Sequence, residues 1–178
     1  MTTDAREQRI LAAAQALFIQ HGYRATRMEA VAKAAGVAKA TLYSRYPDKD
    51  ALFRAGSAQV MTGFRAAFDA AMAQPGTPPQ RFIAAFSAKY AALSELLGGS
   101  PHAGELIAEH ARLCPDEHAA LTVWFTGELA RMLADDNRPD AEELARVTVA
   151  AVEGVKQSFP QLQDFTRLLP LVVGKLLA

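Results

Sequence analysis

The sequence predicts an all-α protein of about nine helices, and three observations lead to this prediction. Apolar residues recur three and four positions apart through most of the 178-residue chain. Alanine is abundant, and β-branched residues do not alternate with polar ones over any useful length. Short segments rich in Gly, Pro or Asp separate the periodic stretches. Because 51% of the residues are hydrophobic and 21% are charged, the chain can form a packed core.

The first helix is expected over about residues 5–21. Asp4 and Glu7 have the spacing of a capping box at its start, and Gly22 suits a left-handed end. One face of this helix carries a continuous apolar stripe made of Ile10, Leu11, Ala14, Leu17 and Phe18.

Two short helices follow, joined at a glycine. The first covers residues 27–34, after a second capping-box spacing at Thr26 and Glu29. Gly36 allows the turn, and the second short helix lies within residues 38–46, because Pro47 cannot continue it. This order is that of a helix-turn-helix. The side chains expected to anchor the pair in the core are Val31, Ala32, Val37 and Leu42.

Longer helices fill the rest of the chain. Asp48 is a good N-cap for a fourth helix over residues 49–73, and the Pro-rich segment 74–80 is the clearest break in the sequence. Beyond it, apolar periodicity and Gly, Pro or Asp separators predict helices at about 80–97, 103–113, 117–134, 140–157 and 163–177.

The charge distribution favours a polyanionic partner for the N-terminal third. The net charge of the whole chain is zero, but residues 1–54 hold nine basic and five acidic side chains. The remaining residues hold ten basic and fourteen acidic ones. A basic segment on an acidic body is typical of a nucleic-acid-binding module joined to another domain.

The second short helix carries the side chains that suit DNA. Its outer face is expected to present base-reading groups in the major groove, namely Lys39, Ala40, Thr41, Ser44 and Arg45. Hydroxyl and basic groups around it are expected to contact phosphates and set the register, namely Thr26, Arg27, Tyr43, Tyr46 and Lys49.

The segment ATRMEAVAKAAGVAKATLYSRYPDKDALF, with the helix before it, resembles the N-terminal helix-turn-helix of the TetR family of bacterial transcriptional regulators over about residues 5–55. The resemblance implies a DNA-binding domain at residues 1–50 and a helical ligand-binding and dimerisation domain at 51–178. It also implies phosphate contacts at Thr26, Tyr43 and Lys49. The chain departs from the family pattern at Ala38, where Ser is common, and at Arg45 and Tyr46, where His and Phe are common.

A homodimer is expected, because one short recognition helix reads too few base pairs to be specific without a two-fold copy on a palindrome. Two late helices are apolar over more than one stripe, and the residues expected at the dimer interface are Leu121, Phe125, Leu129, Leu144, Val147, Ala151 and Val155.

The resemblance also implies a pocket for a small organic effector whose binding releases the DNA. Aromatic side chains between residues 64 and 124 either line such a pocket or fill a core, and Glu105, Glu109 and His110 are candidate polar groups. The lining residues expected are Phe64, Phe68, Phe86, Tyr90, Glu109, His110 and Trp124.

Other classes of function are disfavoured. His102, His110 and His118 are eight residues apart, which does not suit metal ligation from one helix, and Cys114 is the only cysteine. No motif for nucleophilic catalysis or for a cofactor occurs. The N-terminus lacks the apolar core of a signal peptide, and no apolar run is long enough for a membrane span, so a cytoplasmic protein is expected. The alternatives to a ligand-released repressor are a helical small-molecule-binding or scaffold dimer without specific DNA binding, an activator, and a repressor controlled by a protein partner.

Overall fold

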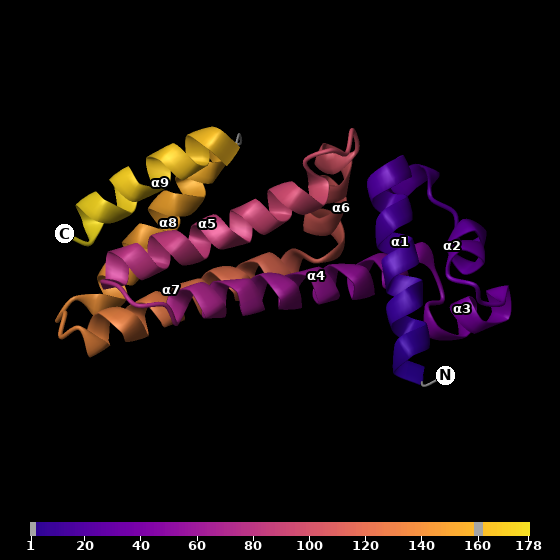
Figure 1. The fold of residues 1–178 in the computed structure, drawn as a ribbon, viewed down its shortest axis with the longest axis horizontal. Coiled ribbons are helices and arrows are strands. Elements are labelled where there is room, and N and C mark those ends of the chain that lie inside the picture. Colours follow the sequence, from indigo (N-terminus) through magenta and orange to yellow (C-terminus); the bar gives the residue numbers. More distant parts are fainter. Residues whose placement is uncertain (1–2, 159–161) are drawn as a thin grey trace. The chain divides into compact units, whose positions relative to one another are not determined.

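The computed structural model describes residues 3–158 and 162–178, and the described chain consists of nine helices joined by short loops (Figure 1). The predicted all-α fold is confirmed. The helices are α1 (Thr3–Ala25), α2 (Met28–Ala34), α3 (Lys39–Arg45), α4 (Lys49–Met72), α5 (Pro78–Leu97), α6 (Ala103–Leu113), α7 (Pro115–Asp135), α8 (Ala141–Ser158) and α9 (Leu162–Leu176).

The end of α1 differs from the expected stop at residue 21. Helical hydrogen bonding runs on to Ala25, but Gly22 interrupts the helical geometry with φ 80° and ψ 166°. This positive φ is readily adopted by glycine and is strained for other residues. The glycine therefore breaks the helix where the sequence predicted, and one further turn follows the break.

The capping groups agree with the sequence at two helices and differ at a third. An Asp48 carboxylate oxygen accepts a hydrogen bond from the Ala51 amide at 2.7 Å, so the predicted N-cap of α4 is confirmed. The N-cap of α3 is Ala38, which makes no side-chain capping hydrogen bond because its methyl group has no acceptor atom. The capping box expected at Thr26 and Glu29 is wrong, because α2 begins after Arg27 without a side-chain cap.

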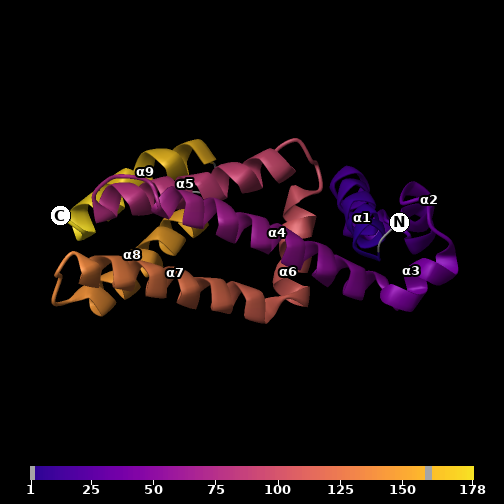
Figure 2. The same cartoon turned by 60° about the horizontal axis from the view of Figure 1, so that its bottom comes forward.

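The chain divides into two compact units. Unit 1 comprises the chain up to Gly63 together with Leu96–Pro115, and unit 2 comprises Phe64–Glu95 and Asp116–Ala178. Unit 1 therefore contains α1–α3, the first part of α4, and α6. Unit 2 contains the last part of α4, most of α5 and α7, and all of α8 and α9, the last two of which pack together (Figure 2).

The core of unit 1 confirms the helix-turn-helix packing expected from the sequence. Ile10, Val31 and Leu42 are fully buried. Phe18 packs against Tyr23 and Phe53, with ring centroids 5.8 and 5.3 Å away. Leu106 and Leu113 bring one face of α6 into the same cluster. Buried apolar side chains on every helix of unit 1, with Leu42 alone on α3, thus hold α2 and α3 in place.

The core of unit 2 is rich in aromatic rings. The centroid of Phe68 lies 5.7 Å from that of Phe86 and 4.8 Å from that of Phe125, and these three side chains are almost completely buried. Tyr90 on α5 packs on Phe165 of α9, with centroids 4.1 Å apart. Separately, no helix in the described part of the chain has the length and apolar character needed to cross a bilayer.

Candidate functional site

The outer face of α3 is an exposed and largely polar surface of the helix-turn-helix. Leu42, completely buried, fixes the inner face of α3, and Lys39, Ala40 and Ser44 are then exposed on the other side. Thr41 is half-buried, and its carbonyl accepts a hydrogen bond from the Ser44 hydroxyl at 2.9 Å. The structure thus brings these predicted base-reading residues together on one short helix.

Glu29 on α2 lies beside two of the predicted DNA contacts. Its carboxylate is 3.6 Å from the Lys39 ammonium and 3.5 Å from the Tyr43 hydroxyl, which donates to it. The carboxyl pKa of Glu29 is lowered, first by a backbone hydrogen bond and then by the charge of Lys39. Tyr43 keeps 41% of its surface exposed. The carboxylate therefore occupies a position next to the groups expected to meet phosphate.

Glu7 on α1 holds the other end of α3. Arg45 donates to its carboxylate at 3.0 Å, and the Tyr46 hydroxyl donates to the other carboxylate oxygen at 3.0 Å. Tyr46 is buried, and this burial, with the Glu7 hydrogen bond second, raises the pKa of Tyr46 to about 12. Arg45 is half-buried, and Tyr46 reaches the interior of unit 1. Sequence reasoning did not identify Glu7 as their common partner.

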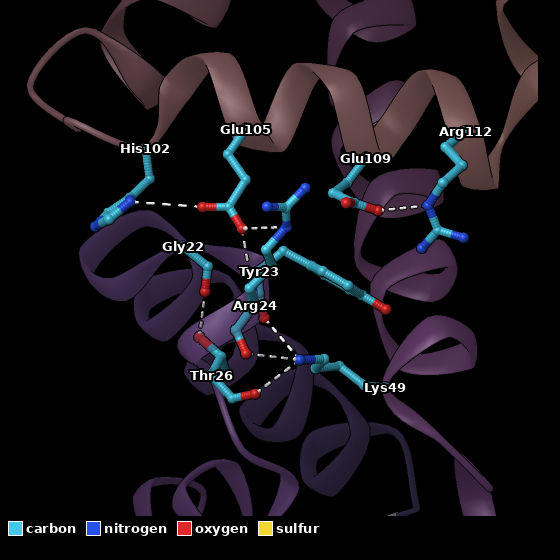
Figure 3. Close-up of polar contacts among 9 residues, drawn as sticks. All are labelled: Gly22, Tyr23, Arg24, Thr26, Lys49, His102, Glu105, Glu109 and Arg112. Carbon is cyan, nitrogen blue, oxygen red and sulfur yellow. Dashed lines mark hydrogen bonds and ion pairs between the residues drawn. The ribbon is translucent and has the colours of Figure 1, made fainter.

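Thr26 and Lys49 bind the backbone at the end of α1 (Figure 3). The buried Thr26 hydroxyl donates to the Gly22 carbonyl at 2.7 Å. The Lys49 ammonium donates to the carbonyls of Tyr23, Arg24 and Thr26 at 2.8, 3.1 and 3.1 Å. Both side chains satisfy carbonyl groups that the broken helix leaves without partners. Arg27, the remaining predicted phosphate contact, is exposed.

Carboxylates of α6 attach this helix to α1 (Figure 3). Glu105 accepts a hydrogen bond from the Arg24 backbone amide at 2.9 Å and lies 3.6 Å from the His102 ring nitrogen. The buried Glu109 pairs with Arg112 at 2.7 Å, and Arg112 also approaches Asp50 of α4 at 3.9 Å. Polar contacts thus join α6 to both α1 and α4 within unit 1.

Tyr23 completes this connection. Its hydroxyl donates to the Asp50 carboxylate, and the Lys49 ammonium lies 4.4 Å above its ring. Burial, followed by the hydrogen bond to Asp50, raises the pKa of Tyr23 to about 12. These contacts could not be predicted from local patterns, because the residues involved are 26 or more positions apart.

The residues expected to line a ligand pocket belong to both units. Phe64, Phe68, Phe86, Tyr90 and Trp124 are in unit 2, where the aromatic rings pack on one another; the Phe68 and Trp124 centroids, for example, are 5.0 Å apart. Glu109 and His110 are on α6 in unit 1. The buried Lys89, whose ammonium lies among the unit 2 rings, was not singled out from the sequence.

The residues expected at the dimer interface differ in exposure. Those on α7 are buried within unit 2: Leu121, Phe125 and Leu129 are 7%, 2% and 0% exposed. On α8, Val147 is 48% exposed, and three further residues are half-buried, namely Leu144, Ala151 and Val155. The exposed Val147 also lines a surface groove between α7 and α8 with Thr122, Thr126, Glu143, Arg146, Val149 and Ala150.

Comparison with known proteins gives a family for the N-terminal region. Residues 10–55 match the family model for bacterial regulatory proteins of the tetR family. Over 48 residues the chain is 48% identical to the uncharacterized HTH-type transcriptional regulator YhgD of Bacillus subtilis (strain 168). That match covers 27% of this chain and only a quarter of the relative's length.

Solved structures resemble the whole chain. A TetR-like transcriptional regulator from Rhodococcus sp. RHA1 matches with a TM-score of 0.68 and 22% identity, over 99% of this chain and 98% of that one. The SmeT–triclosan complex matches with a TM-score of 0.65 and 22% identity, over 97% and 90%. Residues 10–55 therefore match the N-terminal domain of bacterial regulatory proteins of the tetR family, and the chain shares its all-α fold with a TetR-like regulator along its length.

Proposed function

We propose that this protein is a sequence-specific DNA-binding transcriptional repressor that binds a palindromic operator as a homodimer and leaves it when a small organic ligand binds. The observation that carries this function is the exposed polar face of α3, held by the buried Leu42 inside a TetR-type helix-turn-helix. An exposed helix of this kind fits the major groove, where base edges offer distinct donors and acceptors.

The base-reading groups are Lys39, Ala40, Thr41, Ser44 and Arg45. The exposed ammonium of Lys39 suits guanine acceptors, and the methyl group of Ala40 lets the backbone come close to the bases. Arg45 is paired with Glu7 in the unbound protein, so it must exchange or share that partner to reach a base.

Phosphate contacts fall into two groups. Arg27 and Tyr43 have exposed side chains, and DNA binding in this account depends mainly on these two for backbone contacts. Thr26, Tyr46 and Lys49 already bind carbonyl or carboxylate oxygens. Their predicted phosphate contacts require those groups to exchange or share partners, and in the unbound protein they hold α1, α2 and α3 together.

Pairing of two chains is supported by the apolar character of α8. Val147 is nearly half exposed, and Leu144, Ala151 and Val155 lie at helical spacing around it. Leu121, Phe125 and Leu129 of α7 are buried within unit 2, so their predicted place at the interface requires that pairing exposes or rearranges α7. A symmetric pair places two copies of α3 on the two halves of a palindrome.

Release by an organic ligand is supported by two findings. Unit 2 contains an aromatic cluster suited to an apolar molecule, with Phe68, Phe86, Tyr90 and Trp124 among its members, and the fifth predicted lining residue, Phe64, is buried in the same unit. A protein of similar fold, SmeT, has been solved in complex with triclosan. A ligand that binds one conformation of the dimer better than the other shifts the population away from DNA.

The function is tested by fluorescence anisotropy of the purified protein on duplexes tiled across the DNA that flanks its own gene. A palindromic segment bound with at least ~10³-fold preference, and an affinity that falls steeply between two salt concentrations, are the expected results. Weak and uniform binding to every duplex, repeated in a genome-wide pull-down, would favour the alternative of a small-molecule-binding or scaffold dimer.

A further inference from the structure

Lys89 is a buried cation with neither an ion-pair partner nor a hydrogen-bond partner among the described residues. It lies in the middle of α5 with 7% of its surface exposed. Its ammonium lies 4.4 Å from the ring centroid of Phe125, 5.1 Å from that of Tyr90 and 5.6 Å from that of Phe86. Within the described ranges, no carboxylate is close enough to form an ion pair with it. Aromatic rings compensate only part of the hydration that a buried ammonium loses.

The charges around Lys89 leave a positive excess. Glu153 on α8 is the acid that acts on it electrostatically, but the carboxylate of Glu153 already lies 3.6 Å from the Lys156 ammonium. Lys156 in turn lies 5.5 Å from the Tyr90 ring centroid. Two ammonium groups and one carboxylate therefore surround Tyr90, and the local charge suits one additional negative charge.

The Tyr90 hydroxyl is a second, independent sign of a missing partner. Tyr90 is 7% exposed, and its hydroxyl oxygen is buried with no hydrogen-bond partner among the described residues. Burial raises the pKa of Tyr90, so the hydroxyl keeps its proton at neutral pH and acts as a donor. Buried polar groups in proteins nearly always have a partner, and a group that lacks one calls for an explanation.

We propose that Lys89 and the Tyr90 hydroxyl form the anion-binding end of a small-molecule site in unit 2, and that its ligand is an organic carboxylate with an apolar body. A carboxylate supplies both the missing charge for the ammonium and an acceptor for the hydroxyl. The rings of Phe86, Phe125 and Phe165 lie beside these groups, and such surroundings favour an apolar body over a strongly hydrated inorganic anion. This inference rests on the proposed ligand-released function and specifies its ligand class.

The test measures binding of the full-length protein by titration calorimetry at pH 7. The probes are the sodium salts of hexanoic, decanoic, benzoic and naphthoic acids, each compared with its uncharged primary amide and with inorganic phosphate. At least one carboxylate is expected to bind at least ~10-fold more tightly than its amide, as expected for a hydrogen-bonded charge pair. In the Lys89→Met variant, the affinity for that carboxylate is expected to fall to the affinity for its amide.

Lys175→Met serves as the matched control, because it removes an exposed lysine of unit 2 and is expected to leave the preference for carboxylates intact. Circular dichroism melting of each variant checks that it is folded. If no carboxylate binds better than its amide or than phosphate, or if the folded Lys89→Met variant keeps the preference, the anion site is excluded.

A separate arm distinguishes this site from the proposed function. The carboxylate that binds best is added to the wild-type protein on its operator duplex. Release of DNA supports both the site and the repressor function. Carboxylate binding through Lys89 without release supports the site and contradicts ligand control of the repressor. Release caused only by neutral compounds supports the repressor and contradicts the site.

Discussion

The Lys39 ammonium lies 3.6 Å from the Glu29 carboxylate on the surface expected to meet DNA. The same carboxylate accepts a hydrogen bond from the Tyr43 hydroxyl. Both groups are predicted DNA contacts. In the unbound protein the Glu29 carboxylate therefore binds the groups that are expected to bind DNA. Phosphate must replace or repel this carboxylate when DNA binds.

Substituting Glu29→Gln is expected to strengthen DNA binding. Loss of the Glu29 charge frees Lys39 and removes a repulsion of phosphate, so we expect the affinity for DNA to rise by a few-fold at most, because an exposed ion pair is weak. Anisotropy on the operator duplex measures the change, with Glu142→Gln on α8 as a control that removes an exposed acid of unit 2. An equal gain in both variants would mean a general charge effect, and a loss in Glu29→Gln would contradict the account.

Tyr43→Phe and Tyr46→Phe are expected to have different effects. Tyr43 is 41% exposed, so losing its hydroxyl weakens binding to all DNA sequences by about 1 kcal/mol per subunit, with little change in stability. Tyr46 is buried and donates to Glu7, so Tyr46→Phe lowers the free energy of unfolding by about 1 kcal/mol. Urea denaturation and anisotropy on operator and unrelated duplexes separate the two effects. Identical behaviour of the two variants would contradict the assignment.

Gly22→Ala is expected to destabilise the protein for two reasons. The φ of +80° is strained for alanine, and an added Cβ would collide with the Glu105 carboxylate. A loss of roughly 1–2 kcal/mol from the backbone is expected, and the Glu105 carboxylate must move away from the added Cβ and from the Arg24 amide that donates to it. Gly127→Ala is the control, because its Cβ meets nothing within 4 Å inside α7, and it is expected to be neutral or stabilising.

The collision and the strain can be separated by a double variant. Adding Glu105→Ala to Gly22→Ala removes the collision and leaves the strain, so the double variant should lose less than the sum of the two single changes. Strict additivity in thermal denaturation would show that α6 does not contact the end of α1 as described.

Lys89→Met is expected to stabilise the protein below pH 8. Burial lowers the pKa of Lys89 to about 8, whereas the unfolded chain keeps a pKa near 10.5. The folded state therefore bears the full cost of the buried charge below pH 8, on the order of 1–3 kcal/mol after the attraction of the rings. Between pH 8 and 10.5 the unfolded chain binds more protons, so this cost disappears as pH rises.

The measurement is the difference in unfolding free energy between wild type and Lys89→Met from pH 7 to 10. The difference isolates Lys89 from Tyr23 and Tyr46, whose pKa values near 12 contribute stability that is lost only above pH 10. The advantage of the variant should shrink as pH rises. A constant difference would mean that Lys89 does not lose its proton in this range.

Local sequence signals predicted much of this fold because they act over a few residues. The Asp48 cap, the break at Gly22 and the buried Leu42 each follow from capping, backbone freedom or apolar spacing. The roles of Thr26 and Lys49 did not follow, because their partners are carbonyl groups set free by the break in α1. A residue type shows what a side chain is able to bind, and only the fold decides which partner it meets.

The aromatic residues illustrate the same limit at longer range. Periodicity cannot distinguish a side chain that fills a core from one that lines a pocket, and Phe68 and Trp124 contact each other from distant parts of the chain. Similarly, apolar stripes on two helices predicted an interface, while Leu129 is fully buried within its own unit and Val147 is exposed. Lys89 escaped notice because a single lysine in a helix is usually at the surface.

The central claim, that α3 reads DNA sequence, is tested most directly by selecting bound duplexes from a random pool with the wild-type protein and with Thr41→Ala. We expect an inverted repeat for the wild type, with half-sites about one helical turn apart or a multiple of it. We also expect that Thr41→Ala relaxes the preference at one position in each half-site and leaves the others unchanged. Recovery of no common sequence by the wild-type protein, or of an identical sequence by both proteins, would contradict readout by α3 as described.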